Sequence, residues 1–150
     1  VHTLKRIMDN LISNAIKFSF PNSNVFINVF EKAGSAYISI QDEGPGISME
    51  DQKKMYNKFQ KLSARPTSGE SSNGLGLSIV KRMIEKLDGE ITVSSALGQG
   101  TEFLIRLNKK SGREKMESSE TQILKFSPSL TRRIESDEKK FLITRQQNIG

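Results

Sequence analysis

Three stretches of the chain carry apolar side chains at the i, i+3, i+4 spacing that is typical of an amphipathic helix. The first helix is predicted over residues 3–18. The second is predicted over residues 48–59, where Ser48 and Asp51 have the spacing of a capping box, and the third over residues 74–88. The apolar positions of the first helix are Leu4, Ile7, Met8, Leu11, Ile12 and Ala15.

Alternation of apolar and other residues predicts four strands in two antiparallel hairpins. Residues 25–29 pair with 36–40, and residues 91–93 pair with 103–107. Gly89 precedes the second hairpin and fits the C-terminal cap of the third helix. Two hairpins and three amphipathic helices bury their apolar faces most simply in an α/β fold of two layers. We therefore expect a two-layer α/β sandwich in which one mixed sheet of about five strands is covered on one face by the helices.

Two segments lack any such periodicity. Residues 62–73 are polar and predict a mobile loop. Residues 109–150 are rich in Ser, Lys, Arg and Glu, and we interpret them as a basic linker or tail that is largely disordered. A strand over residues 140–144 is conceivable, but a lone strand would have nothing to pair with. The folded domain is therefore expected over residues 1–108.

Composition excludes several classes of protein. Zero Cys and a single His exclude a disulfide scaffold, a thiolate metal site and a multi-histidine metal centre. No apolar run approaches the roughly 18 residues of a membrane span. We therefore expect a cytoplasmic fragment that does not contact the membrane, whether or not the parent protein is anchored in one. The chain begins with Val1 and is expected to be a piece of a longer protein. Most of the net charge of +6 lies in a tail without interleaved aromatics, which disfavours nucleic-acid binding.

Candidate chemistry begins on the first helix. Asn10, Asn14 and Lys17 stand at i, i+4 and i+7, so they share one face. An amide oxygen is a suitable neutral ligand for magnesium that already holds phosphate oxygens, and a lysine one turn further on can reach a phosphate. A solvated helix face would explain Lys17 equally well, but it explains the two asparagines less well, since Asn is a mediocre helix former.

A second candidate follows the first hairpin. Asp42 ends an apolar strand and precedes Gly44 and Gly46. A carboxylate at the floor of a pocket can accept a hydrogen bond from the exocyclic amine of adenine, which guanine does not offer at that position. The glycines allow close approach of the backbone or a positive φ angle. An ordinary turn would also produce this pattern.

The third candidate opens the third helix. Residues 73–77 (Asn-Gly-Leu-Gly-Leu) lie where free N–H groups and the helix dipole favour a phosphate. The sequence is neither a P-loop nor a dinucleotide fingerprint, because no strand ends in it and no Gly-Lys-Ser/Thr follows. Helix entry with tight packing is the alternative interpretation.

Together, the order and spacing of these motifs resemble the catalytic, ATP-binding domain of sensor histidine kinases, whose wider superfamily includes the ATPase domains of gyrase and of mismatch-repair proteins. The resemblance covers about residues 1–108 and implies a Bergerat-type ATP-binding fold. The stretches that carry it are residues 9–19 (N box), 42–47 (G1 box), 56–59 (F box), 74–81 (G2 box) and 98–101 (Gly-Gln-Gly-Thr).

The resemblance implies a role for each matching residue. Asn14 would be the principal magnesium ligand, with Asn10 beside it. Phe18 would lie near the adenine of ATP, Asp42 would bind its amine, and Thr101 would support that contact.

The phosphates would be bound by basic side chains and by backbone N–H groups. Lys17 would contact phosphate, and Lys58 and Lys61 stand where the family often has basic residues. Residues 62–73 would form the ATP lid. The backbone donors would be those of Gly74, Leu75, Gly76 and Leu77, and the catalytic groups would be Asn10, Lys17 and Lys58.

The position of Asn10 favours a kinase. Gyrase-type relatives have a glutamate there that orients water, whereas an amide cannot accept a proton, so the γ-phosphoryl group is expected to be kept for another nucleophile. His2 lacks the acidic residue and Arg-Thr-Pro that follow the family's acceptor histidine. The expected partners are therefore ATP, histidine-bearing dimerisation helices elsewhere in the parent protein, and a downstream response regulator.

Two alternatives stay open. Ser72 replaces a glycine that the family usually has, and lysines replace arginines in the F-box region, so the chain could be a module that holds nucleotide without transferring its phosphate. The other alternative is a gyrase-type ATPase, which Asn10 argues against.

Overall fold

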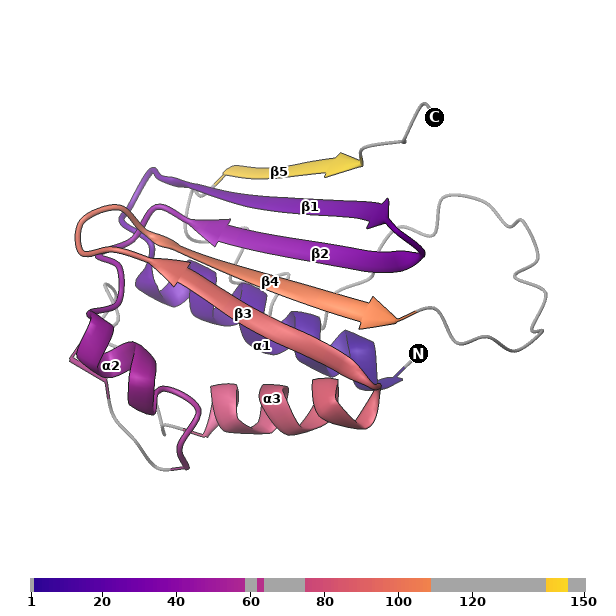
Figure 1. The fold of residues 1–150 in the computed structure, drawn as a ribbon. Helices are drawn as coiled ribbons and strands as arrows, with labels where there is room; N and C mark the ends of the chain where they lie inside the picture. Colours follow the sequence, from indigo (N-terminus) through magenta and orange to yellow (C-terminus); the bar gives the residue numbers. More distant parts are fainter. Residues whose placement is uncertain (1, 59–61, 64–74, 109–139, 146–150) are drawn as a thin grey trace.

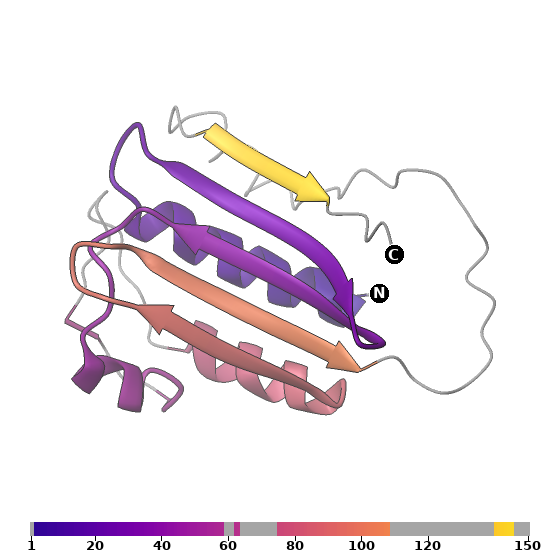
Figure 2. The same ribbon diagram turned by 45° about the horizontal axis from the view of Figure 1, so that its top comes forward.

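The computed structural model describes residues 2–58, 62–63, 75–108 and 140–145. These ranges form two layers, a five-stranded sheet and a layer of helices on one of its faces (Figure 1). The other face of the sheet is not covered by any helix of the described part of the chain (Figure 2). The predicted two-layer α/β sandwich is confirmed.

All three predicted helices are present. They are α1 (His2–Phe18), α2 (Met49–Lys54) and α3 (Gly76–Lys86). Helices α1 and α3 pack against each other and against the sheet, α1 under β2 (Ser35–Asp42) and α3 under β3 (Gly89–Ser95). The short α2 lies beyond the end of this layer, near the start of α3 (Figure 1).

Two helix ends differ from the prediction. Helix α2 ends at Lys54 rather than near residue 59, because the chain turns at the buried Met55 and the Asn57 N–H bonds the Lys54 carbonyl. At the end of α3 the left-handed residue is Asp88 (φ 53°), not Gly89. Gly89 instead begins β3, where a Cβ would lie 2.7 Å from the Arg106 carbonyl oxygen, so a glycine is needed there for close packing of two strands.

The strands are arranged in the order β3-β4-β2-β1-β5. Every neighbouring pair is antiparallel except β1 and β5, which are parallel, so the sheet is mixed as predicted. Asp42, at the end of β2, lies between Val25 of β1 and Thr101 of β4. The strands not yet delimited are β1 (Asn24–Lys32), β4 (Thr101–Asn108) and β5 (Lys140–Arg145).

The expectation that a strand near residue 140 would have nothing to pair with was wrong. Strand β5 pairs with β1 from Asn24↔Lys140 to Val29↔Arg145. The reason is that the β1–β2 hairpin leaves the outer N–H and C=O groups of β1 unpaired, which is a ready template for a further strand. Residues 109–139 lie outside the described residues, so the domain boundary at residue 108 stays a prediction.

The core lies between the helices and the sheet. Fifteen apolar side chains are buried there, and they come from α1 and α3, from Met55 directly after α2, and from β1, β2 and β4. The buried residues of α1 are those that the helical spacing selects except Leu4, which is only partly buried, and Ile16 is buried in addition. The strands contribute the inward member of each alternating pair, namely Val25, Ile27, Ile38, Ile40, Phe103 and Ile105.

Helix α3 offers a matched test of this core. Ile84 is fully buried, whereas Ile79 on the same helix is 39% exposed. We expect Ile84→Ala to lower the free energy of unfolding by about 2–5 kcal/mol, because it leaves a cavity. The control Ile79→Ala should lower it by less than about 1 kcal/mol. Denaturant unfolding of both variants measures the difference, and equal losses would contradict the packing described here.

Candidate functional site

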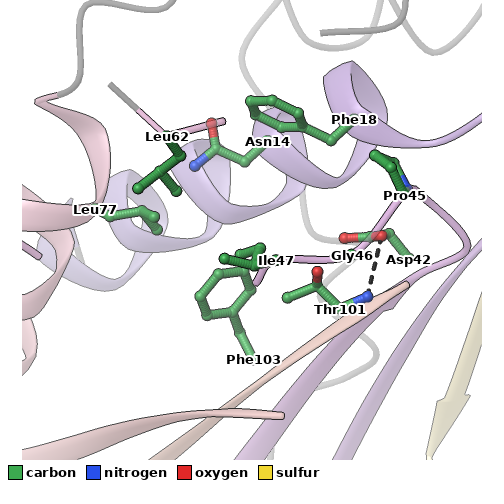
Figure 3. Close-up of a pocket in the computed structure, with 10 residues that line it drawn as sticks. All are labelled: Asn14, Phe18, Asp42, Pro45, Gly46, Ile47, Leu62, Leu77, Thr101 and Phe103. Carbon is green, nitrogen blue, oxygen red and sulfur yellow. Dashed lines mark hydrogen bonds between the residues drawn. The ribbon is translucent and has the colours of Figure 1, made fainter. Parts of the chain in front are cut away.

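A pocket opens between the helix layer and one end of the sheet (Figure 3). It encloses about 430 Å³, its mouth included. Its walls come from α1, from the loop after β2, from β4, from the start of α3 and from the segment after α2. The lining residues are Asn14, Phe18, Asp42, Pro45, Gly46, Ile47, Leu62, Leu77, Thr101 and Phe103.

A buried carboxylate lies at one end of this pocket. Asp42 is 5% exposed, and its Oδ1 accepts hydrogen bonds from the N–H groups of Gly44 (2.9 Å) and Thr101 (3.2 Å). No described residue donates a hydrogen bond to Oδ2, so this oxygen can accept one from a ligand. The carboxylate therefore offers the pocket one hydrogen-bond acceptor in a fixed position (Figure 3).

Burial also changes the acidity of this group. Desolvation raises the pKa of Asp42 to about 6, although the two backbone donors act in the opposite direction. The folded protein consequently holds a proton between about pH 4 and pH 6 that the unfolded chain has lost. The free energy of unfolding contributed by this group falls as the pH rises through that window.

Two glycines allow the loops around Asp42 to meet. Gly46 (φ 75°) lies so close to the next loop that a Cβ would be 2.0 Å from the Ala96 carbonyl oxygen. A Cβ on Gly100 (φ 80°) would likewise lie 2.0 Å from the Asp42 carbonyl oxygen. Both residues combine a left-handed backbone with a close approach, which only glycine tolerates.

Ser95 joins these loops through three hydrogen bonds. Its Oγ accepts from the Ile47 N–H at 2.8 Å, donates to the Gly100 carbonyl at 2.8 Å and lies 2.9 Å from Thr101 Oγ1. The Thr101 side chain is thereby held beside Asp42. Sequence reasoning missed Ser95, because a serine at the end of a strand has no distinctive spacing.

The other end of the pocket brings together α1 and the start of α3. A Cβ on Gly76 would lie 3.3 Å from Asn10 Oδ1 and 3.9 Å from Asn14 Nδ2. Asn10 donates its Nδ2 hydrogen to the Arg6 carbonyl of its own helix at 2.9 Å, which turns its oxygen toward Gly76. Two amide groups therefore face the N-terminal end of a helix, where backbone N–H groups favour an anion.

This arrangement suits a magnesium–phosphate group. The described part of the chain contains no cluster of three His, Cys, Asp or Glu side chains that could hold a metal on its own. An amide oxygen such as Asn10 Oδ1, next to a helix start that favours an anion, suits a magnesium ion that shares its ligands with a phosphate and with water. Asn10 and Asn14 are the residues that fit this role.

The structure brings most of the predicted residues together. The pocket is lined by Asn14, Phe18, Asp42, Gly46, Leu77 and Thr101, while Asn10, Gly44 and Gly76 lie directly beside lining residues. Lys17, Lys58 and Leu75 are described but do not line the pocket. Lys61, Ser72 and Gly74 lie outside the described residues, as do residues 64–73 of the predicted lid.

Sequence reasoning missed four lining residues. Pro45 and Ile47 stand within the Asp-Glu-Gly-Pro-Gly-Ile motif, so the motif already contained the signal. Phe103 was assigned only to a strand of the second hairpin, and it is 5% exposed while also lining the pocket. Leu62 was assigned to a polar loop, and no local pattern marks it as a wall of the site.

Comparison with known proteins identifies the family. The family model described as "Histidine kinase-, DNA gyrase B-, and HSP90-like ATPase" matches residues 1–111. The chain belongs to this family. The membership confirms the resemblance that the motifs indicated, and it makes ATP the nucleotide expected in a pocket with these features.

Relatives of this ATPase-family chain include a bacterial histidine kinase and a bacterial sensor protein. It is 35% identical over 102 residues to the circadian input-output histidine kinase CikA of Synechococcus elongatus, covering 68% of this chain and 14% of CikA. It is 37% identical over 106 residues to the sensor protein SrrB of Staphylococcus aureus, covering 71% of this chain and 18% of SrrB. The chain thus spans less than a fifth of the length of these curated relatives.

Solved structures of the family share the fold. The mycobacterial sensor histidine kinase MprB superposes with a TM-score of 0.64 at 29% identity, covering 71% of this chain and 72% of that one. The nucleotide-free catalytic domain of histidine kinase ThkA gives a TM-score of 0.61 at 28% identity, covering 72% and 67%. Among the helices of the described residues, none is long and apolar enough to cross a membrane.

The turn between β3 and β4 allows the close approach of Gly100 to Asp42 to be tested. Gly100→Ala should lower the free energy of unfolding by about 2–5 kcal/mol, because it adds a collision to a strained φ angle. Gly98→Ala is the matched control, since Gly98 also has a positive φ (77°) but nothing lies within 4 Å of its added Cβ. The free energy of unfolding of the control should fall by only about 1–2 kcal/mol. Thermal or denaturant unfolding of both variants decides, and a control that loses as much as Gly100→Ala would contradict the collision.

Proposed function

We propose that this chain is the ATP-binding catalytic domain of a two-component sensor histidine kinase. It binds magnesium–ATP and donates the γ-phosphoryl group to a histidine on a separate dimerisation domain of the parent protein, which then passes the group to a response regulator. One observation carries the proposal: a buried carboxylate, Asp42, stands at one end of a pocket whose other end is formed by Asn14 and the start of α3.

Adenine fits the end of the pocket that holds Asp42. The exocyclic amine of adenine donates a hydrogen bond that Asp42 Oδ2 can accept, whereas guanine presents an oxygen there, and two acceptors would repel each other. Thr101, fixed by Ser95, stands next to this contact. Phe18 and Ile47 provide apolar contacts for the flat base.

The triphosphate fits the end of the pocket where α3 begins. The backbone N–H groups of Gly76 and Leu77 would bind phosphate oxygens, and the lack of a side chain at Gly76 leaves room for them. Asn10 and Asn14 would hold the magnesium ion, whose charge offsets that of the phosphates when it is bound. Lys17, Lys58 and Lys61 remain proposed phosphate contacts on the strength of the family resemblance.

One observation favours transfer over hydrolysis, and a second concerns where the acceptor lies. Asn10 cannot accept a proton from water, and its Nδ2 is already bonded to the Arg6 carbonyl, so an attacking water would lack a general base at this position. The exposed His2 lies at the opposite end of α1 from Phe18 and from the pocket. The acceptor is therefore a histidine of another domain, whose ring nitrogen bonds to the γ-phosphorus while the bridging oxygen leaves with ADP.

Incubation of the chain with γ-labelled ATP, magnesium and a separately supplied helical dimerisation domain of a sensor kinase tests this proposal. We expect label on the acceptor histidine and little phosphate release when the acceptor is omitted. Tight ATP binding without transfer to any acceptor would favour a nucleotide-binding module instead. Sustained release of phosphate without an acceptor would favour a gyrase-type ATPase.

Asn14→Asp should shift the magnesium concentration needed for binding while leaving the preference for adenine intact.

The raised pKa of Asp42 makes binding depend on pH. Because the protonated acid no longer offers Oδ2 as a free acceptor, ATP affinity should fall roughly tenfold between pH 7 and pH 5 for a pKa of about 6. Asp42→Asn should bind ATP more weakly at pH 7 and discriminate less against GTP. Calorimetry of both proteins at each pH separates this effect from titration of the nucleotide itself, which is common to both. A variant with the same pH dependence as the unmodified protein would contradict the assignment.

A further inference from the structure

A second buried carboxylate lies outside the set of residues that sequence reasoning assigned to the pocket. Asp51, in the first turn of α2, is only 1% exposed. Carboxylates are almost never fully buried unless other groups pair with them. The contacts of Asp51 therefore indicate what this short surface helix does.

The helix itself does not require this carboxylate. Ser48 caps α2 by accepting the Asp51 N–H at 3.1 Å. In a complete capping box the Asp51 side chain would return a hydrogen bond to the Ser48 N–H. Instead, among the described residues, it bonds across to Ser63, twelve residues further along the chain. The predicted capping box is thus only half formed.

Each carboxylate oxygen of Asp51 has a partner. Oδ2 accepts the Ser63 N–H at 2.8 Å, and Oδ1 lies 3.2 Å from Lys54 Nζ. The Ser63 N–H, and after it the Ser63 side chain and Lys54, lower the pKa of Asp51 despite its burial, so the group is charged at neutral pH. A charged acceptor makes the stronger kind of hydrogen bond.

This bond fixes the backbone directly after a wall of the pocket. Leu62 lines the pocket and immediately precedes Ser63. In Figure 3 its side chain lies beside Asn14 and Leu77, at the end of the pocket away from Asp42. Holding the N–H of residue 63 restricts the peptide that joins it to residue 62, and with it the direction of the Leu62 side chain.

We propose that Asp51 is a positioning residue for nucleotide binding: through its bond to the Ser63 N–H it holds Leu62 as one wall of the pocket. Lys54 neutralises the carboxylate without itself lining the site. The inference rests on the proposed function, because it assigns Asp51 a share in the affinity for the nucleotide. Asp51 does not line the pocket, so the proposal assigns its effect on the nucleotide to Leu62.

A double-mutant cycle tests this route. ATP affinity is measured for the unmodified chain, Asp51→Ala, Leu62→Ala and the double variant. Leu62→Ala removes the apolar wall itself, so we expect it to bind ATP roughly tenfold more weakly. Asp51→Ala removes only the bond that positions this wall, so we expect a loss of affinity that is measurable and no larger than that of Leu62→Ala. The double variant should bind about as weakly as Leu62→Ala alone, because the two residues act through one contact. Losses that multiply, or Asp51→Ala with unchanged affinity, would overturn the proposal.

Two further variants separate positioning from folding. Glu50→Ala removes the neighbouring acid, whose side chain is 87% exposed and also pairs with Lys54, and should leave affinity unchanged. Asp51→Asn keeps an oxygen that can accept the Ser63 N–H, so its affinity should lie between those of the unmodified chain and Asp51→Ala. Asp51→Asn binding as weakly as Asp51→Ala would exclude the hydrogen bond as the cause, and denaturant unfolding confirms that each variant is folded.

The failure of this inference and that of the proposed function are distinguishable. If the unmodified chain binds no ATP, the proposed function fails and the cycle has no starting value. If it binds ATP and the variants behave additively, only the role of Asp51 is lost. Where transfer to a supplied acceptor is observed, Asp51→Ala should raise the KM for ATP and leave kcat nearly unchanged.

Discussion

The carboxylate of Asp42 is held at the point where the sheet, the loop after β2 and the β3–β4 turn meet. It is the last residue of β2, it lies between Val25 and Thr101 in the sheet, and its Oδ1 accepts backbone hydrogens from both sides of the junction. Burying a charge there costs free energy, which is why its pKa lies near 6. The surrounding features, including the glycines that permit close approach and the bridging Ser95, keep this one group inside while leaving one of its oxygens facing the pocket.

The remainder of the pocket is built on a different principle. Asn14 and Phe18 are presented by one face of α1 at a spacing of four residues, and α3 begins directly opposite. No side chain at Gly76 separates the two helices. One end of a ligand can therefore bind a fixed acceptor, and its other end can bind backbone donors and amides. This arrangement suits a nucleotide, which has an uncharged base at one end and charged phosphates at the other.

Much of this could be predicted from the sequence, because the relevant signals are local. The spacing of Asn10 and Asn14 on an amphipathic helix fixes which face they share, and Asp42, at the end of an apolar strand, must lie at one end of the sheet. The parts that escaped depend on contacts between distant segments. Leu62 lines the pocket directly before a peptide that Asp51 binds, and nothing around Leu62 in the sequence indicates this.

The helix ends show the same limit. Both glycine and aspartate can take a left-handed conformation. At the end of α3 it is Asp88 that takes it, because Gly89 packs closely against β4 as the first residue of β3, and no local pattern reveals this packing. Similarly, β5 could be recognised as a candidate strand, but its pairing partner lies more than a hundred residues earlier in the chain.

That pairing has a consequence for the behaviour of the molecule in solution. With β5 in place, the outer strands of the sheet are β3 and β5, and β1 is an inner strand. A chain ending at residue 108 would leave β1 on the outside, with the sequence Asn-Val-Phe-Ile-Asn-Val-Phe, free of proline and of charge over seven residues. Such an edge is prone to join the sheet of a second molecule and to aggregate. The C-terminal strand protects the domain from that form of self-association.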